Sequence, residues 1–363
     1  MPEPSGDQVA RLRLIRSENI GPITYFQLLA RFGSAAAALE AIPDLAARGG
    51  GRAPRLASRS SVEREIEQVG RIGARYLFLG QGLYPPLLAE LETAPPALIV
   101  QGHPSLLDRP AVALVGARNA SAAACRFARS LAQALGEAGT VVVSGLARGI
   151  DSAAHDGALD TGTIAVVAGG VDIFYPPENE ARQRAIAERG LVVSEQPPGT
   201  EPRSRHFPSR NRIIAGLAYG TAVVEAAPRS GSLITARCAA EAGREVMAVP
   251  GSPLDPRAQG CNQLIREGAT LVQSADDVLE AVSPSRIRPF RQPERGFATP
   301  QVEAEADDEA RGTVTEMLNG TPVPVDELIR QSGLPPAIVQ TVLLELELAG
   351  RLERHAGGRA SLM

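Results

Sequence analysis

The sequence predicts an α/β protein: a doubly wound parallel sheet, with a small helical domain before it and a winged-helix domain after it. Between residues 97 and 274, short apolar runs alternate with helical stretches. Before this region the apolar residues recur with helical spacing, and after it three helical segments precede a strand, a Gly-Gly turn and a second strand. Continuous apolar strands that are separated by helices are typical of parallel sheets buried on both faces.

The chain of 363 residues is long enough for two or three domains. Hydrophobic residues make up 44% of it, and no uninterrupted apolar run reaches the roughly 20 residues that a membrane-spanning helix needs. The N-terminal residues lack the basic and apolar segments of a secretory signal. We therefore expect a cytoplasmic globular protein without a membrane partner.

All the basic side chains other than histidine are arginines, because the sequence contains no lysine, and the formal net charge is -4. A guanidinium group can bind phosphate with two hydrogen bonds and can also stack on a flat ring. Cys125, Cys238 and Cys261 are far apart in the sequence. Their spacing predicts neither a disulfide framework nor a metal site, and we expect them to be buried spacers.

Residues 1–75 are predicted to form the helical domain, of the SAM or helix-hairpin-helix kind. Helical periodicity extends from residue 8 to residue 47, and it is broken by "NIGP" at 19–22 and by "RFGS" at 31–34. The first break is similar to a helix-hairpin-helix turn, whose N–H groups can bind phosphate. Because this turn carries no basic residue, we expect it to be structural. The glycine-rich stretch at 49–61 is predicted to be a flexible connection.

Residues 76–282 are predicted to form the sheet domain, which the strand and helix pattern assigns to the Rossmann type. In such a sheet the ligand binds beyond the carboxyl ends of the parallel strands. The strands are expected in the segments "ALIVQG", "AVALVGA", "TVVVSGLA", "TIAVVAGG", "LVVSEQP", "TAVVEAA", "EVMAVPG" and "ATLVQS".

Residues 283–305 are polar, rich in proline and without periodicity, so we expect them to be a linker. Residues 306–363 are predicted to form the winged helix. Its third helix, near 335–349, is apolar and acidic, which is unfavourable for a DNA groove.

We therefore predict a packing or protein-binding role for that helix, and we expect phosphate contacts in this domain only from the hairpin residues Arg351, Arg354 and Arg359. A transcription factor that binds duplex DNA through the winged helix is an alternative that the acidity of this helix disfavours.

Three strand ends carry glycine, an arginine and the start of a helix. Exposed N–H groups at a helix N-terminus favour anions, and an arginine beside each turn strengthens the preference. Any tight turn needs glycine, but three such turns together indicate a site for a polyanion. The residues concerned are Gly116 and Arg118 in the first turn, Ser144, Gly145, Arg148 and Gly149 in the second, and Arg229, Ser230, Gly231 and Ser232 in the third.

The stretch "RSRHFPSRNRI" at 203–213 lies at the same predicted edge of the sheet. We expect Arg210 and Arg212 to bind phosphate and Phe207 to stack on a base, with Arg203 and Arg205 peripheral. The alternative is that Phe207 is an ordinary core ring and that the arginines pair with Glu195 and Glu201.

The sequence does not predict an enzyme. Asp151 and His155 are four residues apart on one predicted helix, but capping by the aspartate and packing of the histidine explain them more simply. No nucleophile–histidine set is present, no phosphate-loop lysine follows "SGS", and the first strand turn lacks the G-x-G-x-x-G pattern of a dinucleotide site. We expect no cofactor and no metal.

The order of motifs in residues 80–282 resembles that of the DNA-processing protein A family, also called Smf. The motifs are "VALVGAR", "VSGLARGIDSAAHDGAL", "GGVDIFYPPEN", "SEQPPGTEPRSRHFPSRNRIIAGLA", "SGSLITA" and "GCNQLIREGA". The resemblance implies a protein of natural transformation that binds single-stranded DNA without sequence preference, protects it and loads the RecA recombinase. It also implies a homodimer formed through the sheet domain, and no catalysis.

The same resemblance implies the DNA-binding residues. They are Arg118, Ser144, Gly145, Arg148, Gly149, Phe207, Arg210, Asn211 and Arg212, with the loop from Arg229 to Ser232 nearby.

A rival hypothesis is a nucleotide-hydrolysing enzyme of the lysine-decarboxylase-like type. Gly231 and Ser232 are similar to the G-T of its phosphate loop, but Leu233, Ile234 and Thr235 stand where that family has catalytic carboxylates. This departure favours binding over hydrolysis.

Overall fold

The computed structural model describes residues 5–283, 305–355 and 357–363, so almost all of the predicted linker lies outside the described residues. The chain divides into two compact units. One comprises Met1–Ile66 together with Gln292–Met363, and the other comprises Glu67–Arg291. The N-terminal and C-terminal segments, far apart in sequence, thus belong to the same unit.

The N-terminal segment consists of helices α1 (Gly6–Ile15), α2 (Pro22–Phe32) and α3 (Ala35–Arg48), followed by α4 (Arg59–Arg71). Ser5 forms a capping box at the start of α1, and Ser34 caps α3 through the N–H of Ala37. Gly33 ends α2 with a φ of 71°, a conformation that glycine adopts at little cost. The helices therefore end at the two predicted breaks.

The C-terminal segment forms a winged helix. Its helices are α13 (Asp308–Glu316), α14 (Val325–Ser332) and α15 (Pro336–Leu348). Its strands are β10 (Val323–Pro324), β11 (Leu352–His355) and β12 (Arg359–Leu362), in the order β10-β12-β11. The two-residue strand β10 was not predicted, because a pair of residues carries no periodicity.

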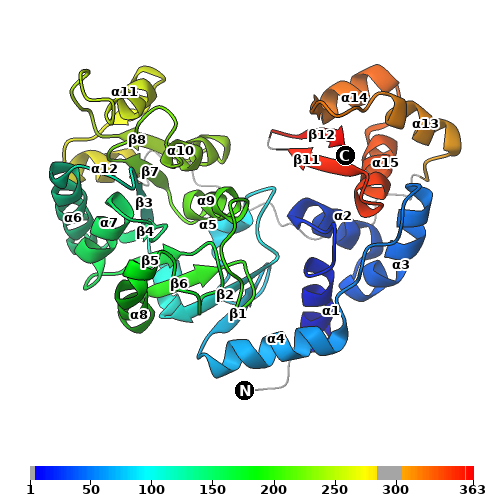
Figure 1. Ribbon diagram of the computed structural model, residues 1–363, viewed down its shortest axis with the longest axis horizontal. Helices are drawn as coiled ribbons and strands as arrows, with labels where there is room; N and C mark the ends of the chain where they lie inside the picture. The colour runs from blue at the N-terminus through cyan, green and yellow to red at the C-terminus, as the bar shows by residue number, and fades with distance from the viewer. Residues whose placement is uncertain (1–4, 284–304, 356) are drawn as a thin grey trace. The chain divides into compact units, whose positions relative to one another are not determined.

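The second unit contains a sheet of nine strands in the order β1-β2-β6-β5-β4-β3-β7-β8-β9 (Figure 1). The strands are β1 (Arg75–Phe78), β2 (Ala97–Gly102), β3 (Ala111–Val115), β4 (Val141–Ser144), β5 (Thr163–Val166), β6 (Leu191–Ser194), β7 (Gly220–Val223), β8 (Glu245–Ala248) and β9 (Thr270–Leu271). Strands β3 to β9 pair only in parallel with one another.

At the β1 end the sheet is antiparallel, which corrects the prediction that all strands run parallel. Strand β2 pairs antiparallel with β1 and with β6. Residues 79–96, which include the four-residue helix α5 (Pro86–Ala89), join β1 to β2. Since the first four residues of β2 are all buried, its sequence looks the same as that of a parallel strand.

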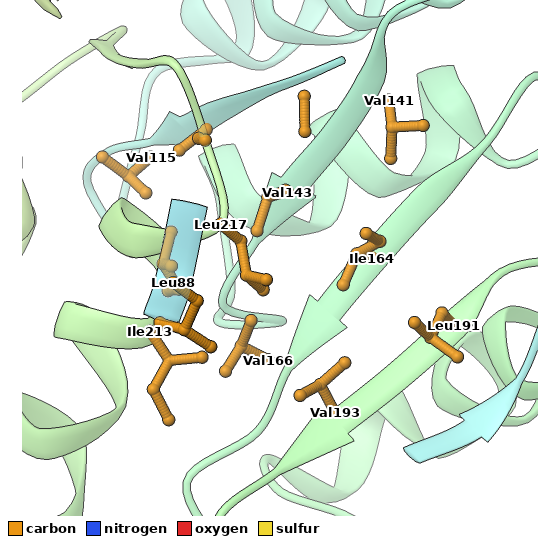
Figure 2. Close-up of a cluster of buried hydrophobic side chains, with 14 of the residues drawn as sticks. Leu88, Val115, Val141, Val143, Ile164, Val166, Leu191, Val193, Ile213 and Leu217 are labelled. Atoms are coloured by element: carbon orange, nitrogen blue, oxygen red, sulfur yellow. The ribbon is translucent and has the colours of Figure 1, made fainter. Parts of the chain in front are cut away.

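Helices cover both faces of the sheet, and alternate strand residues face different helices. Val115, Val143 and Val166 pack with Ile213 of α9 and Leu88 of α5, as Figure 2 shows. Val112, Leu114 and Met247 pack on the other face with α6 and α7. Burying each of these side chains stabilises the fold by about 1.5 to 3 kcal/mol. The helices of this unit are α6 (Ala122–Glu137), α7 (Ile150–Ala158), α8 (Glu180–Arg189), α9 (His206–Gly216), α10 (Ser232–Glu241), α11 (Gln259–Arg266) and α12 (Ala275–Ala281).

Within the described ranges, no helix has both the length and the apolar composition that a membrane crossing requires.

Candidate functional site

Two adjoining cavities lie where β3, β4, β5 and β7 end. The inner cavity has a volume of about 250 Å³, and the outer cleft has a volume of about 750 Å³. The inner cavity is lined by Arg118, Asn119, Gly145, Leu146, Ala147, Arg148, Val167, Ala168, Gly169, Ile173, Tyr175, Pro176, Pro202, Phe207 and Arg210. The outer cleft is lined by residues 115–119, 229–232 and 207–208 together with Ala147, Asp151, Tyr175, Ser204, Arg210, Asn211, Ile214, Ala227, Ile234, Thr235 and Arg257.

An aromatic and cationic wall separates the two cavities, since Arg118, Tyr175, Phe207 and Arg210 line both of them. The guanidinium carbon of Arg118 lies 5.3 Å from the centroid of the Phe207 ring, and that of Arg210 lies 5.9 Å from it. Both distances are within the range of cation–π attraction. The Tyr175 ring is centred 5.7 Å from the Phe207 ring. We call Arg118, Tyr175 and Phe207 the aromatic wall.

Phe207 occupies the first turn of α9, which begins at His206. Pro208 in this turn does not disturb the helix, because the N–H groups of the first turn have no partner within the helix. The start at His206 fixes Phe207 and Arg210 on one helix, three residues apart and thus on the same side.

Arg210 is buried at 7% exposure, and its hydrogen bonds are largely internal. Its Nη1 donates to the carbonyl oxygens of Gly145 and Val166, and its Nε donates to Asn211 Oδ1 at 3.2 Å. Burial lowers the pKa of Arg210 to about 10, with Asp151 opposing and Arg118 adding to the shift. The guanidinium therefore stays charged at pH 7 and ties the ends of β4 and β5 together.

Asp151 lies beneath the same turn. Its Oδ2 accepts the N–H groups of Gly145 at 3.2 Å and Ala147 at 3.3 Å. Burial raises the pKa of this carboxyl group, while Arg210 and the two N–H groups lower it in part. The predicted capping role is thus replaced by a hydrogen-bonded turn, because Gly149, and not Asp151, immediately precedes the first residue of α7.

The exposed cations at the cavities differ in their partners. Arg118 and Arg229 are exposed, and within the described ranges neither has an ion-pair partner. Arg148 pairs with Glu178, and Arg257 pairs with Asp255 at 2.8 Å. Two positive charges without an ion-pair partner in the described ranges thus line the outer cleft, which favours an anionic ligand.

The loop before α10, residues 229–231, lines the outer cleft. Ser230 Oγ and Ser232 Oγ lie 2.7 Å apart, and Asn211 Nδ2 lies 3.5 Å from the carbonyl oxygen of Gly231. A Cβ atom on Gly231 would have no neighbour within 4 Å, so the space above this residue is open to a ligand. The N-terminus of α10, which begins at Ser232, faces this space with the positive end of its dipole.

Three of the predicted site residues lie away from both cavities. Ser144 is fully buried, and its Oγ donates to the carbonyl oxygen of Leu114 at 2.6 Å. Gly149 has a φ of 74°, and a Cβ atom on it would lie 2.2 Å from the oxygen of Ala117. These two residues shape the turn and line neither cavity.

Arg212 is the third. Its Nη2 pairs with Glu195 Oε1 at 2.6 Å, and its Nη1 donates to the carbonyl oxygen of Thr93. Phosphate binding by Arg212 stays a prediction, and of the two interpretations of its charge the structure shows the pairing with Glu195. The reason is helical geometry, because Arg212 and Arg210 are two residues apart and face different directions.

Arg203 and Arg205, expected to be peripheral, are exposed and have no side-chain partner within the described ranges. They lie on the loop whose Pro202 lines the inner cavity and whose Ser204 lines the outer cleft. Burial, and then the charges of Arg205 and Arg203, lower the pKa of His206. These cations are better placed for a ligand than Arg212.

Tyr175 is the main site residue that sequence reasoning missed. It is 47% exposed and lines both cavities. A signal was present in the sequence, because this tyrosine, followed by two prolines, belongs to the loop after β5, at the edge of the sheet where a ligand is expected. His155, by contrast, is fully buried against Thr163, in agreement with the packed interpretation of the Asp151–His155 pair.

The arrangement suits a ligand that combines negative charge with flat rings. The exposed guanidinium groups and the α10 N-terminus can bind phosphate oxygens, and a flat ring can stack on the aromatic wall. Among the residues that the structure describes, no cluster of three or more histidine, cysteine, aspartate or glutamate side chains is placed to hold a metal ion.

Three family models match the chain. The model described as DNA recombination-mediator protein A matches residues 75–283. The model described as DprA-like N-terminal HHH domain matches residues 5–67, and the model described as DprA winged helix domain matches residues 298–358.

Relatives of known name cover most of the chain. Protein Smf of Escherichia coli is 39% identical over 309 residues, which is 84% of this chain and 82% of that protein. DNA processing protein DprA of Streptococcus pneumoniae is 50% identical over 198 residues, covering 54% of this chain and 70% of that protein.

Two solved structures are similar in fold as well as in sequence. The X-ray structure of DprA from S. pneumoniae has a TM-score of 0.62 and 35% identity, covering 76% of this chain and 98% of that one. A Helicobacter pylori structure, described by its single-stranded DNA binding mode, has a TM-score of 0.52 and 29% identity, covering 57% and 94%. The chain therefore belongs to the DNA recombination-mediator protein A family, whose relatives bear the names DprA and Smf.

Proposed function

We propose that this protein binds single-stranded DNA without sequence preference as part of DNA processing in natural transformation. The observation that carries the proposal is the aromatic wall: an exposed tyrosine and a phenylalanine in contact with an exposed arginine, between a small inner cavity and a larger cationic cleft. The H. pylori relative, whose structure concerns single-stranded DNA binding, supports the same ligand for this chain.

Each cavity suits a different part of a nucleotide. The outer cleft carries the charges of Arg118 and Arg229 and the α10 N-terminus, and it is large enough for a stretch of sugar-phosphate backbone. The inner cavity is smaller and bounded mainly by apolar groups such as Leu146, Val167 and Ile173. While the sugar-phosphate backbone stays in the outer cleft, one of its bases would enter the inner cavity and stack on the aromatic wall. Every base has a flat face, so such binding is indifferent to sequence.

Duplex DNA fits this arrangement poorly. Stacking on the aromatic wall requires an unpaired base, and extracting one from a duplex costs a few kcal/mol. A single strand does not incur this cost. We therefore assign the cleft to single strands.

A tryptophan reporter tests the assignment, because the chain contains no tryptophan. In Phe207→Trp, oligothymidine should quench the indole fluorescence saturably by stacking on it. Phe174→Trp is the matched control, because Phe174 lies under Arg184 at 4.5 Å and lines neither cavity. If saturating DNA leaves the Phe207→Trp emission unchanged while anisotropy shows binding, the DNA binds elsewhere.

The family resemblance also leads us to propose a homodimer through the sheet unit and delivery of DNA to the RecA recombinase in the cytoplasm. Strand β9 is a sheet edge with Leu271 43% exposed, which is a surface that pairing with a second copy would cover. Sedimentation at micromolar concentration tests the dimer, and RecA-filament formation on coated DNA tests the delivery.

We further propose that the protein binds DNA without catalysing a reaction on it. The loop at Gly231 and Ser232 carries no carboxylate in its next three residues, and the buried Asp151 is held by two N–H groups of its own turn. Incubation with nucleoside monophosphates should release no free base. Release that disappears in Asp151→Asn would favour the nucleotide-hydrolase alternative.

A further inference from the structure

Helix α15 has two apolar sides, only one of which belongs to the winged helix. Val339, Val342, Leu343 and Leu346 face the core of the winged helix, with the spacing of one helix face. Leu344 and Leu348 face elsewhere, yet they are 3% and 0% exposed. A helix that is apolar on several sides needs more than one partner.

The second partner is the N-terminal helical segment. Leu344 and Leu348 join the cluster formed by Tyr25, Leu28 and Ile42, which is the core of that segment. In the same unit α15 contacts α3, and Figure 1 shows these two helices side by side. One hydrophobic core is thus assembled from residues about 300 positions apart in the chain.

Glycines at the end of α3 allow the two backbones to touch. A Cβ atom on Gly49 would lie 2.2 Å from the carbonyl oxygen of Glu345, and one on Gly51 would lie 2.3 Å from that of Ala349. Both distances are too short for any side chain. Neither glycine needs its special backbone freedom, since Gly49 has a φ of -70° and Gly51 has no positive φ. The stretch predicted to be a flexible connection is therefore a contact surface at its first residues.

Polar groups complete the contact. Gln27 and Gln340 are hydrogen-bonded at 3.0 Å, and Arg354 donates to Gln27 Oε1 at 3.3 Å. Arg351 donates to the carbonyl oxygen of Gly49 at 3.0 Å. Two of the three hairpin arginines that were expected to contact phosphate are therefore engaged within the chain. Arg354 is also paired with Glu347 at 2.7 Å.

The contact involves both features through which the two segments could read duplex DNA, and Asn19 in the first of them remains exposed. The turn between α1 and α2, similar to a helix-hairpin-helix turn, carries Asn19, whose Nδ2 lies 3.5 Å from the carbonyl oxygen of Leu348. Helix α15, the third helix of the winged helix, is occupied by the N-terminal core.

We propose that α15 is a docking surface for the N-terminal helical domain of its own chain. The close backbone approach at Gly49 and Gly51, which we call the glycine seam, holds the N-terminal helical domain and the winged helix together. The winged helix holds the N-terminal domain instead of reading DNA. The partner of this surface is a segment of the same polypeptide, and the contact persists without a covalent connection.

In the test, the full-length protein is cleaved between the sheet domain and the winged helix. A protease recognition sequence replaces part of residues 284–304, the purified chain is cleaved, and the products are separated by gel filtration at micromolar concentration. The C-terminal fragment should co-elute with the remainder. In the double variant Gly49→Ala, Gly51→Ala it should be released, with at least a tenfold rise in the dissociation constant. Gly6→Ala is the matched control, because a Cβ atom there would have no neighbour within 4 Å.

Release of the fragment from the cleaved wild-type protein would overturn the proposal, whatever the variants do. Equal retention by the double variant and the control would overturn the role of the glycine seam. Circular dichroism of the uncleaved double variant, compared with the control, shows whether its helices remain folded. Release from a folded double variant is the expected result.

Discussion

Arg118, Arg210 and Arg212 all belong to the predicted site, but their surroundings give them different roles. Arg118 is exposed and lies over the Phe207 ring, Arg210 is buried on two carbonyl oxygens, and Arg212 is paired with Glu195. A charge that is already compensated by a carboxylate gains little from phosphate, because it must give up one partner for another. We therefore expect Arg118 to dominate the affinity for DNA.

Alanine substitution separates these roles. Arg118→Ala should weaken single-strand binding about tenfold, the equivalent of one charge-assisted contact, and leave the thermal midpoint unchanged. Arg212→Ala should leave the affinity within about twofold of wild type but reduce the free energy of unfolding by about 1 to 3 kcal/mol, because the half-buried ion pair with Glu195 and the hydrogen bond to Thr93 are lost. Fluorescence anisotropy and thermal unfolding measure the two quantities. The opposite pattern would mean that Arg212 turns toward DNA when it binds.

His155 makes stability depend on pH. Thr163 Oγ1 donates to the carbonyl oxygen of Val142, so His155 must donate its Nδ1 proton to Thr163. Its Nε2 is buried and has no hydrogen-bond partner among the residues that the structure describes. Burial lowers the pKa of His155 to about 3 from its ordinary 6.5. Between these values the unfolded state binds one proton more than the folded state, so stability falls by about 1 kcal/mol per unit as pH decreases below 6.5.

Urea unfolding at pH 7.0, 6.0 and 5.0 measures this dependence. His155→Gln should flatten it relative to wild type, although its stability at pH 7 is lower. His103→Gln, at a surface position outside the core, serves as the control and should keep the wild-type slope. Identical slopes in all three proteins would show that His155 does not remain neutral.

Among the elements, the strands and the turns that follow them could be predicted, because each leaves a local pattern of apolar residues and glycine. The direction of β2 could not, since its residues are buried in the same way in either orientation. The backbone partners of the α9 arginines could not either, because the carbonyl groups of Thr93, Gly145 and Val166 are distant in sequence. The pairing of Arg212 with Glu195 was one of the two interpretations that the sequence allowed. The glycines at 49 and 51 look like a loop signal, but their reason is the approach of α15.

Two glycines at the ends of β4 and of the loop before α10 provide a test at this scale. In Gly145→Ala the new Cβ atom would lie 2.7 to 2.9 Å from the guanidinium group of Arg210. Because Arg210 is fixed on both strand ends, we expect a loss of about 1 to 3 kcal/mol in stability and weaker DNA binding. Gly231→Ala meets no atom within 4 Å and should leave stability unchanged. Thermal unfolding of both variants measures these stabilities. Equal unfolding midpoints for Gly145→Ala and Gly231→Ala would mean that the Arg210 side chain can move away from the new methyl group.

For the whole molecule, the net charge of -4 does not describe the site. The uncompensated arginines and the exposed rings of the cavities all belong to the unit Glu67–Arg291, whereas the contacts of Arg351 and Arg354 lie within the other unit. A protein truncated to residues 67–283 should therefore retain the single-strand affinity of the full chain within about threefold. An anisotropy titration of both proteins at equal salt checks this. A loss of more than tenfold would place an essential contact in the terminal segments.

The most direct test of single-strand binding at the aromatic wall is an anisotropy titration of oligothymidine and of a duplex of equal length, at several salt concentrations, with wild type and Arg118→Ala. The protein should prefer the single strand at every salt concentration, and its affinity should fall linearly on logarithmic axes. The slope should be smaller by about 0.7 in Arg118→Ala, the value for one phosphate contact on a single strand. Equal affinity for the duplex, or an unchanged slope and affinity in Arg118→Ala, would contradict the assignment.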